Sequence, residues 1–229
     1  MENDEKTTIM DIANHRSSIY GLLAAIYRSE ATSDLLVQVK DPRFLGVLAN
    51  LGLDLNGDFI QKPEDELLND LAIEYARLFL GPGKHISPHE SVHYQRDDGK
   101  WGQLWGESTV EVERFIKATG LSYEADYKGM PDHISVEFEL MEALARQEAI
   151  ALSENDKTKA RRCLDVQRKF LEEHLIRWIP FFCEKVIKEA ELPFYRAFAE
   201  LTLRFINFDI QEINRNEDRG RKGHKGDKE

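Results

Sequence analysis

Apolar side chains recur at helical spacing along almost the whole chain, and this periodicity constrains the fold more than any other feature. One stripe near the start joins Ile12, Ile19, Leu22, Leu23 and Ile26, which is the pattern of a helix with one buried face. No stretch alternates apolar and polar residues between hairpin turns, and no internal repeat is visible. The sequence therefore predicts an all-α fold of about eight or nine helices.

Turn and capping residues divide this pattern into segments. Three local features are expected to act at helix ends or bends: Gly81 as a left-handed cap, Asp132 as an N-cap, and Pro180 as a kink or a break. Residues 51–61 read as a loop that contains turn residues. The predicted helices are a first one ending near Arg28, then 33–39, 41–51, 63–79, 107–119, one from 132 onward, 156–190 and 194–213.

Loop-forming residues gather at 121–131, where we expect a hinge that includes Gly129, Met130 and Pro131. The hinge would separate an N-terminal helical subdomain, residues 1–120, from a C-terminal helical subdomain, residues 132–213. Residues 214–229 are charged and have almost nothing to pack, so they are predicted to be a disordered tail.

The distribution of charge excludes some classes of partner. Residues 214–229 hold six Lys/Arg and four Asp/Glu, which leaves a net charge of −13 on residues 1–213. A body this acidic repels a phosphate backbone, so no nucleic-acid partner is expected. The start of the chain is charged and no apolar run is long enough to span a bilayer, which predicts a cytoplasmic protein without stable membrane insertion. Two cysteines without a CxxC spacing fit a reducing compartment.

Histidines provide the main evidence for chemistry. His85, His89 and His93 recur every four residues, and His133 precedes Glu137 by one helical turn. A metal-dependent hydrolase that uses these five side chains is the alternative function. Prolines and glycines near the first three make a continuous helix there improbable, and no nucleophile is marked, so we expect no metal, no catalytic residue and no enzymatic activity.

A binding groove is the favoured interpretation. Tyr75, Leu78 and Phe79 lie at helical spacing just before a loop that carries Trp101 and Trp105, and this loop is not expected to bury both indoles. Aromatic and aliphatic side chains beside such a loop suit an apolar peptide.

Several motifs resemble the TorD/DmsD/NarJ family of molybdoenzyme maturation chaperones. They are Tyr75-Ala-Arg-Leu-Phe79 before Gly81-Pro82, Pro88-His-Glu-Ser-Val92, Pro131-Asp-His-Ile-Ser-Val-Glu-Phe-Glu-Leu-Met141, and the later Trp178-Ile-Pro-Phe-Phe182 and Pro193-Phe-Tyr195. The likeness runs from about residue 15 to residue 210. One departure is that Gly129-Met130 stands where family members often have Glu and Pro before x-Asp-His.

The resemblance implies a TorD-like helical fold of two subdomains joined by a hinge. It also implies a cytoplasmic chaperone that binds the twin-arginine signal peptide and apoprotein of a molybdenum-containing oxidoreductase and assists cofactor insertion before export. Tyr75, Leu78, Phe79, Pro88 and Ser91 would line the peptide site, and Asp132 and His133 carry over from the hinge motif. Weak guanine-nucleotide binding is implied by the family only, and the chain is expected to be a monomer or a homodimer.

Carboxylates are the expected partners of the peptide's arginines, because the guanidinium fork pairs with them through two hydrogen bonds. The candidates near the predicted groove are Glu90, Asp97, Asp98 and Glu107, together with the acids near Asp132.

Overall fold

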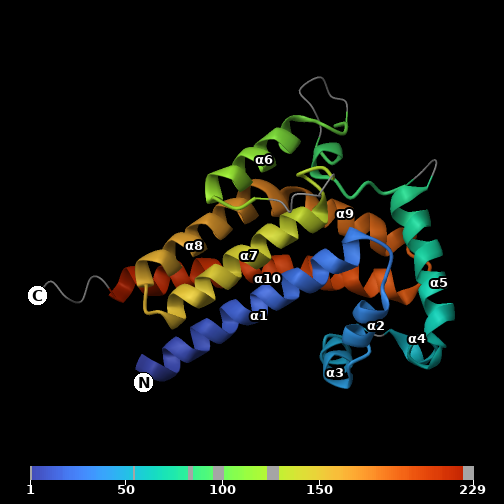
Figure 1. Cartoon of the computed structure of the whole chain (residues 1–229), viewed down its shortest axis with the longest axis horizontal. Coiled ribbons are helices and arrows are strands. Elements are labelled where there is room, and N and C mark those ends of the chain that lie inside the picture. Colours follow the sequence, from blue (N-terminus) through green and yellow to red (C-terminus); the bar gives the residue numbers. More distant parts are fainter. Residues whose placement is uncertain (1, 54, 82–84, 95–100, 123–128, 224–229) are drawn as a thin grey trace, which may run out of the picture.

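The computed structural model describes residues 2–53, 55–81, 85–94, 101–122 and 129–223, and helices dominate it (Figure 1). The turns η1 (Ala76–Leu80) and η3 (Leu171–Leu175) are π-helical, and η2 (Glu90–Val92) is a 3-10 turn. Within the described residues no β-strand forms, and nine helices result when the unbroken segment from Lys157 to Glu189 is counted as one helix. The predicted all-α fold is confirmed. The elements are α1 (Glu2–Arg28), α2 (Ser33–Val39), α3 (Pro42–Asn50), α4 (Asn56–Gln61), α5 (Glu64–Tyr75), η1 (Ala76–Leu80), η2 (Glu90–Val92), α6 (Glu107–Thr119), α7 (Ile134–Ser153), α8 (Lys157–Phe170), η3 (Leu171–Leu175), α9 (Ile176–Glu189) and α10 (Pro193–Gly223).

Four long segments form the centre of the molecule: α1, α7, the continuous α8–η3–α9 segment and α10 (Figure 1). Helices α1 and α7 pack against one another along their lengths and run in opposite directions. The short helices α2 to α4 and helix α5 lie at the end of this bundle where α1 finishes. Helix α6 packs on α8, where the rings of Phe115 and Phe170 approach to 4.9 Å.

One hydrophobic core crosses the predicted subdomain boundary. The ring of Tyr27 on α1 lies 6.1 Å from Phe79, 6.3 Å from Phe138 and 5.4 Å from Phe182, so it joins α1, η1, α7 and α9. The division at residues 121–131 stays a prediction, and residues 123–128 of that loop lie outside the described ranges.

A buried ionic network also ties the long helices together. Arg16 on α1 donates to Glu148 on α7 at 2.9 Å, to Gln167 on α8 at 2.6 Å and to Asp209 on α10. All four side chains are almost fully buried. Because a buried charge is tolerated only when it is paired, this network fixes how the four helices meet.

Several helices begin or end at residues whose side chains or backbone freedom favour a helix end. Helix α2 spans the predicted range and is capped by the hydroxyl of Thr32, and Asp41 accepts from two backbone N–H groups at the start of α3. Gly120 ends α6 in the left-handed conformation, with φ of 77°. Helix α4 lies inside the segment predicted as a loop; it has six residues and no side-chain cap, too little for periodicity to reveal.

The prediction that Gly81 is a left-handed cap is wrong. Its φ of −62° and ψ of 153° are extended, because α5 ends in the wider π turn η1 and the chain leaves without reversing its handedness. Glycine suits this position because the backbone passes close to a carbonyl group: a Cβ here would lie 3.3 Å from the carbonyl oxygen of Ala76.

Pro180 does not divide its segment. The helix is unbroken from Lys157 to Glu189, and the departure from α geometry occurs at η3, about one turn before the proline. A π turn widens the helix locally and is one of the recognised places where a long helix can bend.

Helix α10 continues to Gly223, past its predicted end at Ile213, so the prediction of a disordered tail does not hold for residues 214–223. Extending a helix that already exists is easier than nucleating one, which lets a charged sequence continue it without a core. Residues 224–229 lie outside the described ranges. Among the described residues, no helix combines the length and the apolar character needed to cross a bilayer.

Candidate functional site

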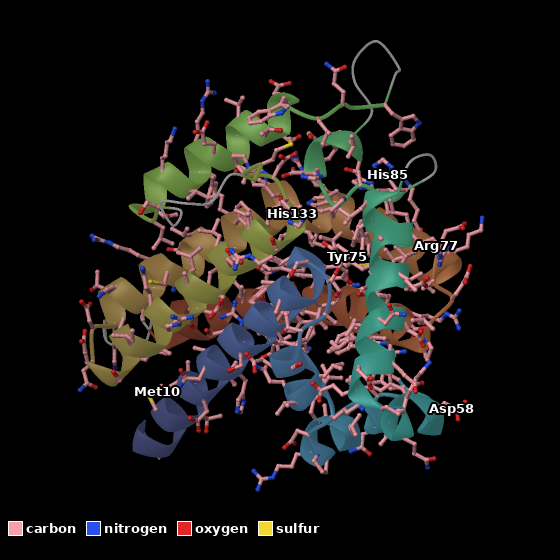
Figure 2. All side chains as sticks on the ribbon, turned by 45° about the vertical axis from the view of Figure 1, so that its right-hand side comes forward. Met10, Asp58, Tyr75, Arg77, His85 and His133 are labelled. Atoms are coloured by element: carbon pink, nitrogen blue, oxygen red, sulfur yellow. The ribbon has the colours of Figure 1, made fainter. Side chains whose placement is uncertain are left out.

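The two motif loops, far apart in the sequence, lie against each other. The backbone N–H of Glu90 donates to the carbonyl of Asp132, and that of Ile134 donates to the carbonyl of Pro88, both at 2.9 Å. The intervening residues, His89 and His133, form a single antiparallel bridge. We call residues 88–91 and 131–134 the clasp. It joins the loop before α6 to the start of α7, close to the upper end of α5 (Figure 2).

Asp132 acts across the clasp, which corrects the prediction that it caps α7. One carboxylate oxygen accepts from the backbone N–H of Ser91 at 3.0 Å, and the other has no partner among the described groups. The cap is His133, whose Nδ1 accepts from the N–H of Ser135 at 3.2 Å. The backbone bridge turns Asp132 toward the opposite loop, and a single sequence carries no sign of that pairing.

His133 is held neutral by its surroundings. Burial lowers its pKa to about 3, and its interactions with His89 and with the Arg28 guanidinium act in the same direction. A neutral ring with a free lone pair on Nδ1 is what a helix cap requires.

A layer of buried acids lies behind the clasp. Glu90 accepts from the hydroxyl of Tyr94 at 2.9 Å and lies 3.0 Å from Nδ1 of His174, and Glu137 accepts from the indole N–H of Trp178 at 3.0 Å. Burial raises the pKa of Glu137 well above its usual range, and the negative charge of Glu90 adds to the effect. Both effects favour the protonated form of the Glu137 carboxyl.

The histidines do not assemble a metal centre or a catalytic set. His85 is exposed, while the Nε2–H of His93 donates to the carbonyl of Ser87 at 2.8 Å and its ring stacks on Trp178. His89 and His133 meet edge to face at 4.9 Å. In the part of the chain that the structure describes, no three His, Cys, Asp or Glu side chains are grouped to hold a metal. The hydrolase hypothesis is not supported.

Three side chains near the end of the α5–η1 segment, which were predicted to line the peptide site, lie in the core. Tyr75, Leu78 and Phe79 are each less than 5% exposed, and the hydroxyl of Tyr75 donates to the carbonyl of Tyr27 at 3.0 Å. In Figure 2 Tyr75 lies on the inner side of its helix, toward the long helices. The clasp residues Pro88, Ser91 and Asp132 are buried too, whereas Met130, Pro131 and His133 are half-buried and Gly129 is exposed. A role of these residues in peptide binding stays a prediction.

Two tryptophans in the loop before α6 have exposed side chains. Trp101 and Trp105 are about two-thirds exposed or more, as expected. Glu90, by contrast, is buried against His174, and Asp97 and Asp98 lie outside the described residues.

Two larger hollows lie on the surface, and none of the predicted peptide-binding or hinge residues lines them. The first, of about 440 Å³, is a groove between α1 and α7 that the end of α6 closes on one side. The second, of about 790 Å³, lies between α6 and the α8–η3–α9 segment. The groove carries two glutamates, Glu139 and Glu142, and Gly21 on the facing helix. Sequence reasoning did not single out either glutamate, although Glu139 lies within the Pro131–Met141 motif and an isolated glycine inside a strong helical pattern signals close packing.

The family model described as nitrate reductase delta subunit matches residues 43–184, more than half of the chain. The chain belongs to this family. It is the family of the TorD and NarJ chaperones, whose members are not enzymes, so the recognised resemblance and the prediction of a non-enzymatic protein are both confirmed.

Curated relatives of this family member cover nearly its full length. Chaperone protein TorD from Shewanella piezotolerans is 27% identical over 86% of this chain and 91% of its own. Chaperone protein TorD from Shewanella pealeana is 24% identical over 91% of this chain and 94% of its own. A solved structure, that of a proposed redox enzyme maturation protein from Archaeoglobus fulgidus, is 18% identical, with a TM-score of 0.49 over 84% of this chain and 93% of that one.

Proposed function

We propose that this chain is a cytoplasmic chaperone that binds the twin-arginine signal peptide and the apoprotein of a molybdenum-containing oxidoreductase. It would hold the apoprotein until the molybdenum cofactor has been inserted and only then release it for export. Membership of the nitrate reductase delta subunit family carries this proposal. The curated relatives named as TorD chaperones agree with it over nearly the whole chain.

The physical properties of the chain suit such a partner. A net charge of −11 favours a peptide that bears consecutive arginines and disfavours nucleic acid. Two backbone hydrogen bonds and the Asp132 carboxylate join the two halves of the clasp, and the imidazoles of His93 and His133 are neutral, so this region suits a rigid support better than chemistry. A rigid helical body with surface hollows is suited to recognition without chemistry.

Calorimetric titration of the full chain with synthetic signal peptides from oxidoreductases tests the proposal. Peptides with the twin-arginine motif are expected to bind at micromolar concentrations, where the binding free energy is about −8 kcal/mol. The matched control is an export signal of the same apolar length without the arginine pair, which should bind at least tenfold more weakly. If no twin-arginine peptide binds below about millimolar, the proposed function is wrong.

The chaperone step needs a separate measurement. Coexpression of the chain with a bound oxidoreductase should raise the fraction of that enzyme that contains molybdenum, measured by elemental analysis. An unchanged metal content with unimpaired peptide binding would restrict the function to peptide recognition.

A further inference from the structure

Two indoles of the loop before α6 stand on the surface of the molecule. Trp101 is 67% exposed and Trp105 is 71% exposed, and Leu104 beside them is 47% exposed. Trp178, the third tryptophan of the chain, is by contrast fully buried. Leaving two indoles in water costs free energy that burial against a partner recovers, and tryptophan is enriched at the energetic centres of interfaces. The pair therefore marks a contact surface.

The backbone at Trp105 is strained. Its φ of 64° lies in the left-handed region, which a bulky side chain rarely adopts. Among the non-glycine residues that the structure describes, only Asn155 shares a positive φ, and asparagine tolerates it. Strain of this kind persists where the surrounding structure enforces it, and it is concentrated at binding sites.

The clasp is the structure that holds this loop. The N–H of Gly102 donates to the carbonyl of Tyr94 at 2.7 Å, and a Cβ on Gly102 would lie only 1.8 Å from the carbonyl oxygen of Ser91. A Cβ on Gly106 would lie 3.2 Å from the Cβ of Ser91. Each glycine directly follows one of the two exposed indoles. The backbone that carries both indoles is therefore seated on the clasp.

Helix α9 extends the apolar surface. The Nζ of Lys185 lies 5.9 Å from the centre of the Trp101 ring, so this indole lies over α9. Phe181 is one helical turn before Lys185, on the same side of the helix, and is 57% exposed. We call the side chains of Trp101, Leu104, Trp105 and Phe181 the aromatic patch.

Charge restricts what can cover the aromatic patch. Its immediate surroundings are balanced, because Lys185 lies over Trp101 while Glu107, two residues after Trp105, is exposed and forms no ion pair with a described residue. The net charge of −11 therefore decides the long-range attraction. It opposes an anionic bilayer, a nucleic acid and a second copy of this chain. An apolar peptide segment that adjoins positive charges suits both the rings and the field.

We propose that the aromatic patch binds the apolar segment beside the arginine pair of the client's signal peptide. The rings of Trp101, Trp105 and Phe181 cover the apolar side chains, and the negative charge of the chain attracts the arginines. This site rests on the proposed function. It gives the buried motif residues of the clasp a supporting role and places the peptide contact on the exposed loop and on α9.

Tryptophan fluorescence of the full chain reads this contact directly. Because Trp178 is already buried in the free chain, a change on binding reports on Trp101 and Trp105. A twin-arginine signal peptide that lacks tryptophan should shift the emission to shorter wavelength and at least halve the acrylamide quenching constant. Calorimetry on the same samples gives the affinity.

Variants of the aromatic patch separate binding from folding. The double variant Trp101→Gln/Trp105→Asn is expected to bind the peptide at least tenfold more weakly. The matched control Phe208→Gln removes a ring that is 51% exposed on α10, and its affinity should stay within twofold of wild type. In Trp105→Asn alone, the melting temperature should stay equal or rise, because asparagine accepts the left-handed conformation, while the affinity falls at least fivefold. A merely structural tryptophan would lower both quantities when replaced.

The outcomes separate the two proposals. If wild type binds no twin-arginine peptide, the proposed function and the aromatic-patch assignment fall together. If wild type binds the peptide while the quenching is unchanged, or if the double variant stays within twofold of wild type, only the patch assignment is overturned. An equal loss of affinity in Phe208→Gln overturns it too.

Two other occupants of the patch are distinguishable without peptide. Protection of the indoles by phosphatidylglycerol vesicles would assign the aromatic patch to a membrane surface. Protection that accompanies dimer formation, seen by light scattering, would assign it to a second copy of the chain. Either result overturns the peptide assignment.

Discussion

Replacing Phe79 with alanine distinguishes a core residue from a peptide contact. The ring is 4% exposed and lies 5.1 Å from Tyr75, 6.0 Å from Phe182 and 5.8 Å from Tyr195 between ring centres. Truncating a fully packed phenylalanine costs about 3–5 kcal/mol through lost burial and the cavity left behind. The aromatic neighbours place this site toward the upper half of that range, because each edge or stacked contact adds about 0.5–1.5 kcal/mol.

Urea denaturation followed by circular dichroism measures this loss. We expect the unfolding midpoint to fall with little change in slope, and the melting temperature to drop by about 8–20 °C, at 2–4 °C per kcal/mol for a chain of this size. The matched control is Phe181→Ala on the same aromatic helix α9, where the ring is 57% exposed and the loss should stay below about 1 kcal/mol.

The reasoning is refuted if Phe79→Ala destabilises the chain no more than Phe181→Ala does. Peptide affinity is best measured on the milder Phe79→Leu variant, which should remain folded. An affinity within twofold of wild type places Phe79 in the scaffold. A tenfold loss in a stable Phe79→Leu protein would show instead that the peptide reaches this ring.

Three other predictions concern buried polar groups. Asp132→Ala should lower the free energy of unfolding by about 1–3 kcal/mol and speed hydrogen exchange at the Ser91 amide, because that buried N–H loses its acceptor. Asp132→Asn should retain most of the protection against exchange. Equal exchange in wild type and Asp132→Ala would contradict this prediction. Arg16→Met should destabilise by about 3–5 kcal/mol in urea, since two buried carboxylates lose their cation; a loss below 1 kcal/mol would mean that the network is dispensable. Burial lowers the pKa of His93 to about 4, so the unfolded state binds more protons than the folded state between about pH 6.5 and 4. The contribution of His93 to stability is therefore lost as the pH falls through that window. His93→Gln should flatten this decline of stability with falling pH, and an unchanged pH profile would refute the assignment.

The fold could be read from the sequence because the signals for helices are local. A stripe such as Ile12 to Ile26 requires only a 3.6-residue repeat, and Gly120 needs only its own freedom at positive φ to end α6. The motif resemblance was likewise visible in short segments, and the family match confirms it. Helix α4, the extended Gly81 and the continuation of α10 escaped prediction because neighbouring turns and cooperative extension of the helix decide them.

What only the tertiary structure decided is which residues meet. The antiparallel bridge between His89 and His133 turned Asp132 from a helix cap into a tie across two loops. Packing of α9 and α10 aromatics around Phe79 placed a predicted groove residue in the core. The groove between α1 and α7 brings Gly21 next to Glu142, residues far apart in the chain. Periodicity shows which side of a helix is apolar, whereas the partner of that side, and the space left between them, depends on long-range packing that no local pattern records.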